Sequence, residues 1–402
     1  MKNRMAGPPE IIHREDEMKK SIKFSLVAGT TLLTVGFAGS AMAFHGGGVA
    51  HCDGCHSMHQ SADNPISGTA NASLLKGTDA SSTCLNCHAG SGGYHINSTD
   101  GSNVSEGGDF YWVSNPYDVD VRGTTYTYGG DNAGHNIVAQ DFSMAADATN
   151  TAAPGGTYSA SLLGCTSCHD AHGQVANGTK GGSAPISVSG SYGDTVPTGT
   201  IAGNYRLLGD GMYEAGDHTG DGFAFAYDAP VAISANSYSS NYGYTSRYGS
   251  GMSGWCGNCH GDYLTNGTKH PVDYAMDGYI TNYNSYVATG DFTGSQATAY
   301  DDLVPFESGA TDNSTMDALS TAGPVTGAKV MCLSCHRSHA SGNNNMGRWD
   351  FETEFLVESA VLESPDVPAT AVPYYKEGVA VDIATDYGQY QRSLCNKCHA
   401  QD

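Results

Sequence analysis

Six copies of the motif Cys-X-X-Cys-His occur along this 402-residue chain, and together they use all 12 of its cysteines. In this motif the two thiols can form thioethers to a haem, and the histidine that follows can ligate the iron from one face. The pattern predicts six covalently attached haem c groups. The predicted attachment residues are Cys52, Cys55, Cys84, Cys87, Cys165, Cys168, Cys256, Cys259, Cys332, Cys335, Cys395 and Cys398, and the predicted proximal ligands are His56, His88, His169, His260, His336 and His399.

Paired cysteines also build zinc sites, thioredoxin-like redox centres and disulfide frameworks. None of these requires a histidine directly after every pair. Histidine makes up 16 of the 402 residues. Chance would place one after each of six pairs with odds of roughly one in 10⁸, which favours haem attachment over the other uses of the motif.

Spare histidines can supply the second axial ligand of each iron. A mature chain that begins at Phe44 has nine of them, more than the six that bis-histidine ligation of every haem requires. An iron with both axial positions filled has no open site for a substrate, so the sequence favours electron transfer over enzymatic catalysis. The nine are His45, His51, His59, His95, His135, His172, His218, His270 and His339, of which His45, His51 and His218 look dispensable from their surroundings.

Every second motif continues to another histidine three residues later. His59, His172 and His339 follow motifs 1, 3 and 5, whereas motifs 2, 4 and 6 lack this residue. On a helix, positions i and i+3 share a face, so the second histidine is predicted to reach an adjacent haem. The alternation suggests a dihaem unit used three times.

The N-terminal segment is typical of a secretory signal. Three lysines between positions 19 and 23 precede a modest apolar stretch, and Ala41-Met42-Ala43 forms a small-residue cleavage site. Residues 1–43 are predicted to be an extension plus signal peptide, with Met18 as an alternative start, and residues 44–402 a single hexahaem unit. One membrane anchor is the weaker alternative, because threonines and glycines interrupt the stretch. Haem c is attached outside the cytoplasm, so the protein is predicted to be exported through the periplasm, without membrane insertion.

Charge restricts the partners of the chain. Its formal net charge is −23, which disfavours nucleic acid and anionic lipid as partners.

The composition is poor in the residues that build ordinary cores. Leu, Ile, Val and Phe account for 62 residues, about 15% of the chain, a level typical of disordered proteins. Haem resolves the conflict, because stacked porphyrins supply apolar surface. The fold class predicted is a multihaem cytochrome c whose haem stack forms the core, with mostly irregular coil, little sheet and short helices at the motifs. A further helix is predicted near Trp349–Leu362.

The chain without haem is expected to be disordered, because its own side chains cannot bury enough apolar surface to fold. Circular dichroism of the apoprotein checks this. A cooperative thermal transition would contradict it.

The chain resembles the OmcS group of extracellular hexahaem c-type cytochromes of metal-reducing bacteria, over essentially the whole predicted mature chain. The motif count and order carry the likeness, together with the segments between the motifs. These segments are Phe44-His45, Gly47-Gly48-Val49-Ala50, Cys52 to His59, Tyr94-His95-Ile96, Gly108-Asp109-Phe110, Gly134 to Val138, Ala153 to Tyr158, Cys168-His169-Asp170, His270-Pro271, Gly294 to Ala297, Pro305-Phe306-Glu307, Cys332 to Ser341 and Tyr390-Gln391-Arg392.

The resemblance implies a secreted filament of stacked haems at or beyond the cell surface. Its expected partners are further copies of the chain, other redox cytochromes, and extracellular acceptors such as ferric oxides, electrodes or partner cells. A monomeric electron shuttle and a multihaem reductase are the alternatives. The resemblance also implies that His59 ligates the fifth haem, held by His336, of the adjoining subunit. The distal ligands that it implies are His59, His95, His135, His172, His270 and His339.

If His59 reaches back to an odd-numbered haem, the other two histidines of this kind are expected to do the same. His172 would then ligate haem 1 and His339 haem 3. The even-numbered haems would draw on His95, His135 and His270.

Overall fold

The computed structural model describes most of the attachment motifs and the segments around them. It describes residues 54–57, 74–91, 95–103, 105–121, 123–171, 205–211, 213–215, 223–234, 246–265, 272–356, 374–376 and 379–399. All of these residues belong to one compact unit, Cys52–Asp402. The predicted signal segment and cleavage site lie outside the described residues.

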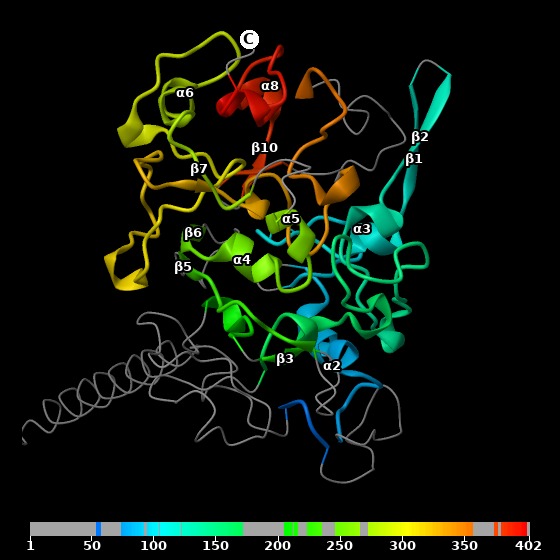
Figure 1. The fold of residues 1–402 in the computed structure, drawn as a ribbon. Coiled ribbons are helices and arrows are strands. Elements are labelled where there is room, and N and C mark those ends of the chain that lie inside the picture. The colour runs from blue at the N-terminus through cyan, green and yellow to red at the C-terminus, as the bar shows by residue number, and fades with distance from the viewer. Residues whose placement is uncertain are drawn as a thin grey trace, which may run out of the picture. The chain divides into compact units, whose positions relative to one another are not determined.

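Helices in the described part are short, and many contain an attachment motif, as the sequence predicts (Figure 1). Helix α2 carries motif 2 and begins at Asp79, whose Oδ1 accepts a hydrogen bond from the Ser82 amide at 2.7 Å; such a cap satisfies an otherwise free amide of the first turn. The α-helices are α2 (Ala80–His88), α3 (Tyr111–Ser114), α4 (Met252–Cys256), α5 (Gly261–Thr265), α6 (Ile280–Ser285) and α8 (Ile383–Asp386). The 3₁₀ helices include η5 (Cys165–Ser167), η9 (Cys332–Ser334) and η12 (Leu394–Lys397) at motifs 3, 5 and 6, and η6 (Tyr205–Leu207) and η10 (Asn344–Met346) beside two of them.

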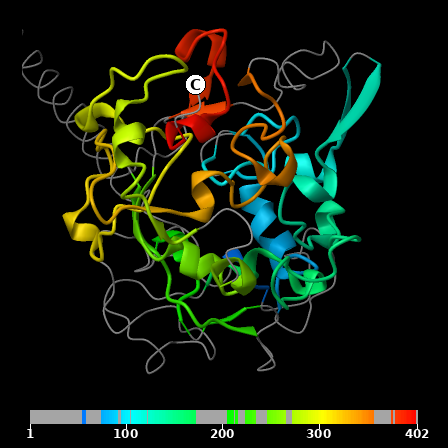
Figure 2. The same ribbon diagram turned by 45° about the horizontal axis from the view of Figure 1, so that its top comes forward.

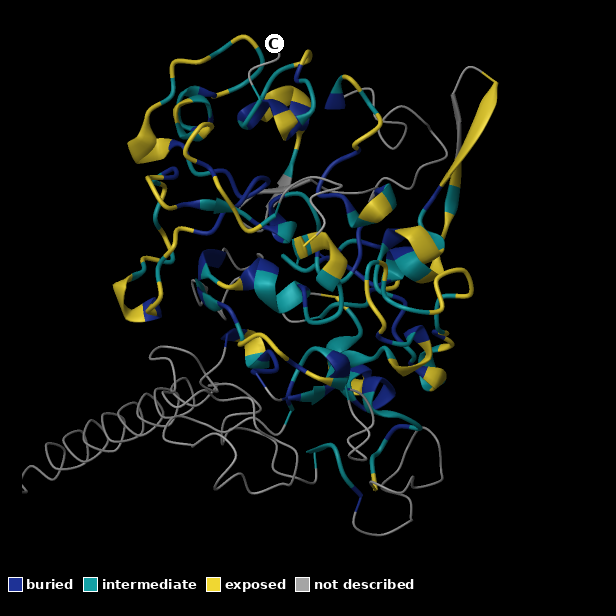
Figure 3. Ribbon diagram, viewed as in Figure 1, coloured by how far each residue is buried: buried dark blue, intermediate teal, exposed yellow. Residues whose placement is uncertain are grey.

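Sheet structure is limited to two-stranded antiparallel pairs in the described residues. The β1–β2 hairpin extends away from α3, and its second strand is largely exposed (Figures 1 and 3). The pairs are β1 (Tyr117–Val121) with β2 (Thr124–Tyr128), β3 (Glu214–Ala215) with β4 (Phe223–Ala224), β5 (Val231–Ser234) with β6 (Ser246–Ser250), β7 (Tyr274–Ala275) with β8 (Lys329–Val330), and β9 (Tyr374–Lys376) with β10 (Val379–Val381).

The helix predicted near Trp349–Leu362 is wrong for its first half. Residues 349–355 are irregular, and the remainder beyond residue 356 lies outside the described residues. Trp349 is fully buried, and its indole N–H donates to Ser393 Oγ at 3.1 Å. Contacts with the C-terminal segment therefore override the local preference for a helix.

Several small clusters take the place of one large apolar core. One surrounds Tyr283, Trp349 and Leu394, and the others include Tyr248, Ile137 and Tyr213. The turned view shows that the chain around them is made of short elements joined by long irregular stretches (Figure 2). Motif cysteines lie at the edge of all four: Cys335 and Cys398, Cys256, Cys165, and Cys259. Apolar side chains thus gather where the thiols are, as expected of a fold whose core includes its cofactors.

Among the described residues, no helix has both the length and the apolar character needed to cross a bilayer.

Candidate haem sites

The attachment motifs follow one another in space in the order of the sequence. Close thiols influence each other's ionisation, and each pair of consecutive motifs has such a contact. The neighbouring Cys165 side chain raises the pKa of Cys84, and Cys55 adds to this shift, which links motifs 1, 2 and 3. The remaining links are Cys168 with Cys259, Cys256 with Cys332, and Cys335 with Cys395 and Cys398. The motifs therefore form one row, 1 to 6.

At two of these junctions the cysteine side chains come close together. Cys84 lies beside Cys165, and Cys256 lies beside Cys332. In each pair the neighbouring thiol raises the pKa of the first cysteine and lowers that of the second. Motifs 2 and 3, and likewise motifs 4 and 5, meet at their cysteine edges.

No disulfide joins any two of the eleven described cysteines. Within the described ranges no group of three or more His, Cys, Asp or Glu side chains comes close enough to hold a metal ion, whereas a structural zinc site needs four ligands.

Two pairs of histidines bring a motif histidine close to one of the predicted distal ligands. The ring centres of His169 and His339 are 6.4 Å apart, and those of His135 and His260 are 6.1 Å apart. Two imidazoles on opposite sides of one metal ion have ring centres roughly 6 Å apart, because each metal–nitrogen bond is about 2 Å long. Both pairs therefore have the separation that bis-histidine ligation of an iron requires.

Backbone carbonyls orient four of the histidines. Nδ1 of His169 lies 2.8 Å from the Arg206 oxygen, and Nδ1 of His336 lies 2.7 Å from the Asn345 oxygen. Nδ1 of His260 and of His135 contact the carbonyl oxygens of Pro154 and Ser338 at 2.8 Å. A carbonyl only accepts, so Nδ1 must carry the proton, and Nε2 keeps its lone pair for a metal.

The carbonyls at motifs 3 and 5 come from the same unusual backbone. Arg206 and Leu207 have φ of 51° and 58°, and Asn345 and Met346 have φ of 58° and 56°. Two successive left-handed residues are rare outside glycine, and each costs of order 1 kcal/mol. The next residue forms a β-bridge to the motif histidine in both cases, Leu208 to His169 and Gly347 to His336. Motif 1 has the same bridge, from His56 to Leu75, again after a left-handed residue, Leu74 (φ 56°).

Motifs 1, 3 and 5, the alternate motifs from which the sequence suggests a dihaem unit, therefore share this bridge. The bridging segments lie at very different distances along the chain, and only Asn345 belongs to a residue type that favours left-handed backbone. Sequence reasoning accordingly missed them.

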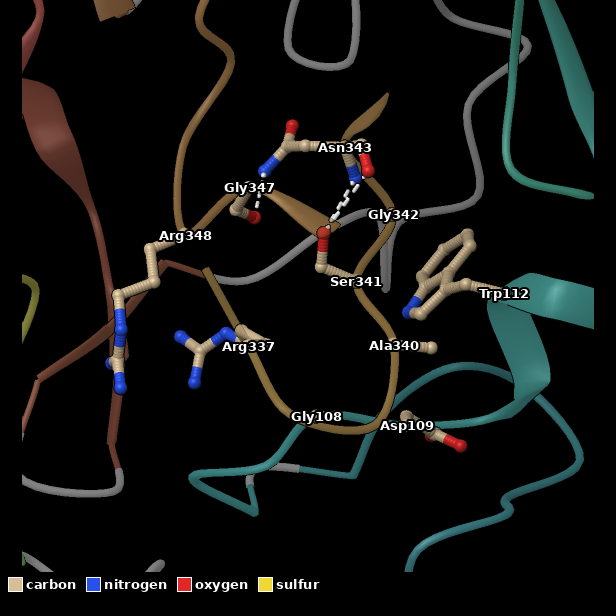
Figure 4. A pocket seen from close by; sticks show the side chains of 10 residues that line it. All are labelled: Gly108, Asp109, Trp112, Arg337, Ala340, Ser341, Gly342, Asn343, Gly347 and Arg348. Carbon is tan, nitrogen blue, oxygen red and sulfur yellow. Dashed lines mark hydrogen bonds between the residues drawn. The ribbon is translucent and has the colours of Figure 1, made fainter. Parts of the chain in front are cut away.

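The bent segment that contains His339 and Ala340 pairs with two glycine-containing segments, and Figure 4 shows Ala340 beside Gly108 and Asp109. Ala340 is bridged to Gly108 on one side and to Gly134 on the other. The His135 amide donates to the His339 oxygen at 2.9 Å. A Cβ at Gly108, where φ is +93°, would lie 1.7 Å from the Ala340 oxygen. Glycine is thus required at position 108. The backbone pairing around Ala340 holds His135 and His339 in a fixed position relative to each other.

The helical relation predicted between the two histidines of motif 5 is wrong. The 3₁₀ helix η9 ends at Ser334, and His336 and His339 lie in extended and bent backbone beyond it. An extended chain directs side chains three positions apart to opposite sides. The His339 ring accordingly turns away from its own motif and lies opposite His169.

Desolvation keeps His135 and His339 neutral, the form that binds metals. It lowers the pKa of His135 to about 4, with His260 adding to the shift. It lowers the pKa of His339 to about 3, with a further contribution from His169.

The remaining candidates divide between described and undescribed residues. His56, His88, His95 and His399 are described, and Tyr279 lies edge-on to His399 with ring centres 5.3 Å apart. Cys52, His59, His172 and His270 lie outside the described residues, as do His45, His51 and His218.

Comparison with known proteins identifies the family. No family model matches the chain. The chain is 38% identical to the C-type cytochrome OmcS of Geobacter sulfurreducens, over 96% of this chain and the whole of that protein. It superimposes on the outer-membrane cytochrome S filament of the same species with a TM-score of 0.67 and 34% identity. It also superimposes on OmcS nanowires of that species, solved by cryo-electron microscopy, with a TM-score of 0.68 and 35% identity. Each match covers 89% of this chain and the whole of the solved chain. The chain therefore belongs to the OmcS family of c-type cytochromes, which carry covalently bound haem c.

Proposed function

We propose that this chain forms secreted head-to-tail filaments that carry electrons over long distances to acceptors outside the cell, such as ferric oxides, electrodes or partner cells. The row of motifs in sequence order carries this proposal, since cofactors attached along it would form one continuous path. The solved relatives, which are filaments and nanowires, support the assembly.

Each of the six haems, when bound, supplies an iron that accepts and releases one electron. The protein's contribution is to fix positions and tune energies. Cysteines hold the porphyrin edges, proximal histidines hold the irons, and the carbonyls on Nδ1 fix the imidazole planes and raise their basicity.

We assign distal ligands by the facing pairs. His339 serves the iron of His169, and His135 serves the iron of His260, in keeping with their ring separations. By analogy with His339, His172 serves haem 1 and His59 serves haem 5 of the adjoining subunit. His95 and His270 serve the two other even-numbered haems. With every axial position filled the protein acts as an electron carrier and not as an enzyme.

Substituting His59→Ala is expected to abolish filaments and give monomers that retain six haems, one of them five-coordinate. A ligand supplied in trans is a head-to-tail contact, and such contacts propagate into open polymers. Cryo-electron microscopy gives the assembly state, and a haem-to-protein ratio with the high-spin signal gives the ligation. His218→Ala is the matched control and should form filaments of ordinary length. Filaments of wild-type length from His59→Ala would refute the trans assignment.

A further inference from the structure

Glu307 is a buried carboxylate with half of its hydrogen-bonding capacity unused. Its side chain is 1% exposed. Oε1 accepts hydrogen bonds from the amides of Met252 and Ser253 at 2.7 and 3.3 Å, whereas Oε2 has no partner among the described residues. Backbone bridges to Tyr248 in β6 and Lys329 in β8 hold the residue in place. A buried acceptor without a partner is costly, so this arrangement calls for an explanation.

The nearest opposite charge does not neutralise Glu307. Lys329 Nζ is paired with Asp273 at 2.7 Å, on the exposed side of β8. None of the ion pairs between described residues includes Glu307. The ionisable groups that face it are Asp273 and Lys329 on the β7–β8 side and the thiols of α4 and η9, with Tyr248 on β6. Burial raises the pKa of Glu307, and the two amides and Lys329 lessen the shift.

The location of this carboxylate links it to two attachment motifs. The amides it binds begin α4, whose last residue is Cys256 of motif 4. That thiol lies close enough to Cys332 of motif 5 for each to shift the pKa of the other, and the charge of Glu307 raises the pKa of both. Two residues before Glu307, the Pro305 oxygen accepts a hydrogen bond from Ser334 Oγ, inside motif 5, at 2.6 Å. Glu307 therefore lies at the junction where motifs 4 and 5 meet.

We propose that Glu307 takes up a proton when the filament is reduced and releases it when the filament is oxidised, so that electron transfer through this junction is coupled to proton transfer. The inference rests on the proposed function, since it requires haems on Cys256 and Cys332. Added negative charge nearby disfavours the ionised carboxylate in a medium of low dielectric. The step balances: one electron enters from the neighbouring redox site, one proton from solvent joins Oε2, and both leave on oxidation.

Reduced-minus-oxidised infrared difference spectra of the native, haem-loaded filament test this directly. We expect a band of a protonated carboxyl group to appear on reduction, to shift in D₂O, and to be absent from Glu307→Gln. Gln keeps an acceptor for the two amides, so the fold should tolerate it. Wild-type filaments without a band on reduction, or a band unchanged in Glu307→Gln, would overturn the proposal. If Glu307→Gln fails to assemble, Glu307→Asp should keep the band at a shifted frequency. A band at the wild-type frequency in Glu307→Asp would come from another carboxyl group and would overturn the proposal.

Proton uptake on full reduction provides a second test, in which wild type should take up more protons than Glu307→Gln within a limited range of pH. Below the pKa of Glu307 in the oxidised state the carboxyl is already protonated, and above its pKa in the reduced state it stays ionised. Between the two, wild type should take up as much as one more proton per subunit than Glu307→Gln. Glu354→Gln is the control, because Glu354 is 63% exposed and pairs with Arg392, and it should match wild type. Variants that form filaments with six haems and conduct, yet show no difference in uptake, would reject the proton site and leave the conduit intact.

Discussion

Replacing His339 with alanine is expected to convert one haem in six from low-spin to high-spin. The His339 ring lies opposite His169 at 6.4 Å, so its loss leaves that iron with one histidine. Axial ligands set haem potentials over a wide range, and loss of an imidazole should raise this one by ~100 mV or more. A haem of higher potential holds an electron more tightly than its neighbours. At 59 mV per factor of ten, about 100 mV slows electron transfer to the next haem by roughly 50-fold. Electron paramagnetic resonance measures the spin state, and single-filament conductance measures the transfer.

Two further variants separate ligation from packing. His339→Met keeps a second axial ligand and should stay low-spin, with a raised potential. His218→Ala should behave like wild type. A His339→Ala protein with six low-spin haems would mean that another residue ligates the iron of His169.

Gly108→Ala is expected to disturb two haems at once and to destabilise the fold by at least about 3 kcal/mol. Its Cβ would meet the Ala340 oxygen at 1.7 Å, in backbone whose φ of +93° already disfavours alanine. The clash would displace the segment from Ser338 to Ala340. This segment carries His339, and the Ser338 and His339 oxygens also hold His135. High-spin signals from up to two of six haems should therefore accompany a lower melting temperature.

Gly123→Ala is the matched control for this effect. Gly123 also has a positive φ, +84°, but a Cβ there has nothing within 4 Å. It should cost only the backbone strain, about 1 kcal/mol, and leave all haems low-spin. Equal losses in the two variants would show that contact with Ala340 is unimportant.

The sequence was sufficient for the chemistry and for much of the fold. The predicted attachment motifs and the irregular coil with short helices follow from spacing and composition, because covalent haem attachment needs a fixed local pattern. The family followed from the resemblance of the segments between the motifs. The assignment of His339 to haem 3 stays a prediction. The His339 ring lies 6.4 Å from that of His169, whereas the helical relation behind the assignment is wrong.

The supporting geometry could not be anticipated. The carbonyls of Arg206 and Asn345 come from left-handed backbone that tertiary contacts impose, at positions with no common spacing from their motifs. Nothing in the sequence indicates that Gly108 and Gly134 both pair with Ala340. Local propensity carries no information about a contact made more than 200 residues away.

The segment from His336 to Ala340 contacts three sites in a row: it holds one proximal histidine, the carbonyl that orients His135, and the histidine facing His169. A conductor made of many hops is limited by its widest gap. Because one tightly packed peptide fastens three successive positions, thermal motion displaces them together, and the gaps between them vary less than the positions themselves. Under the proposed ligation, this one peptide thus keeps the spacing of three successive haems nearly constant.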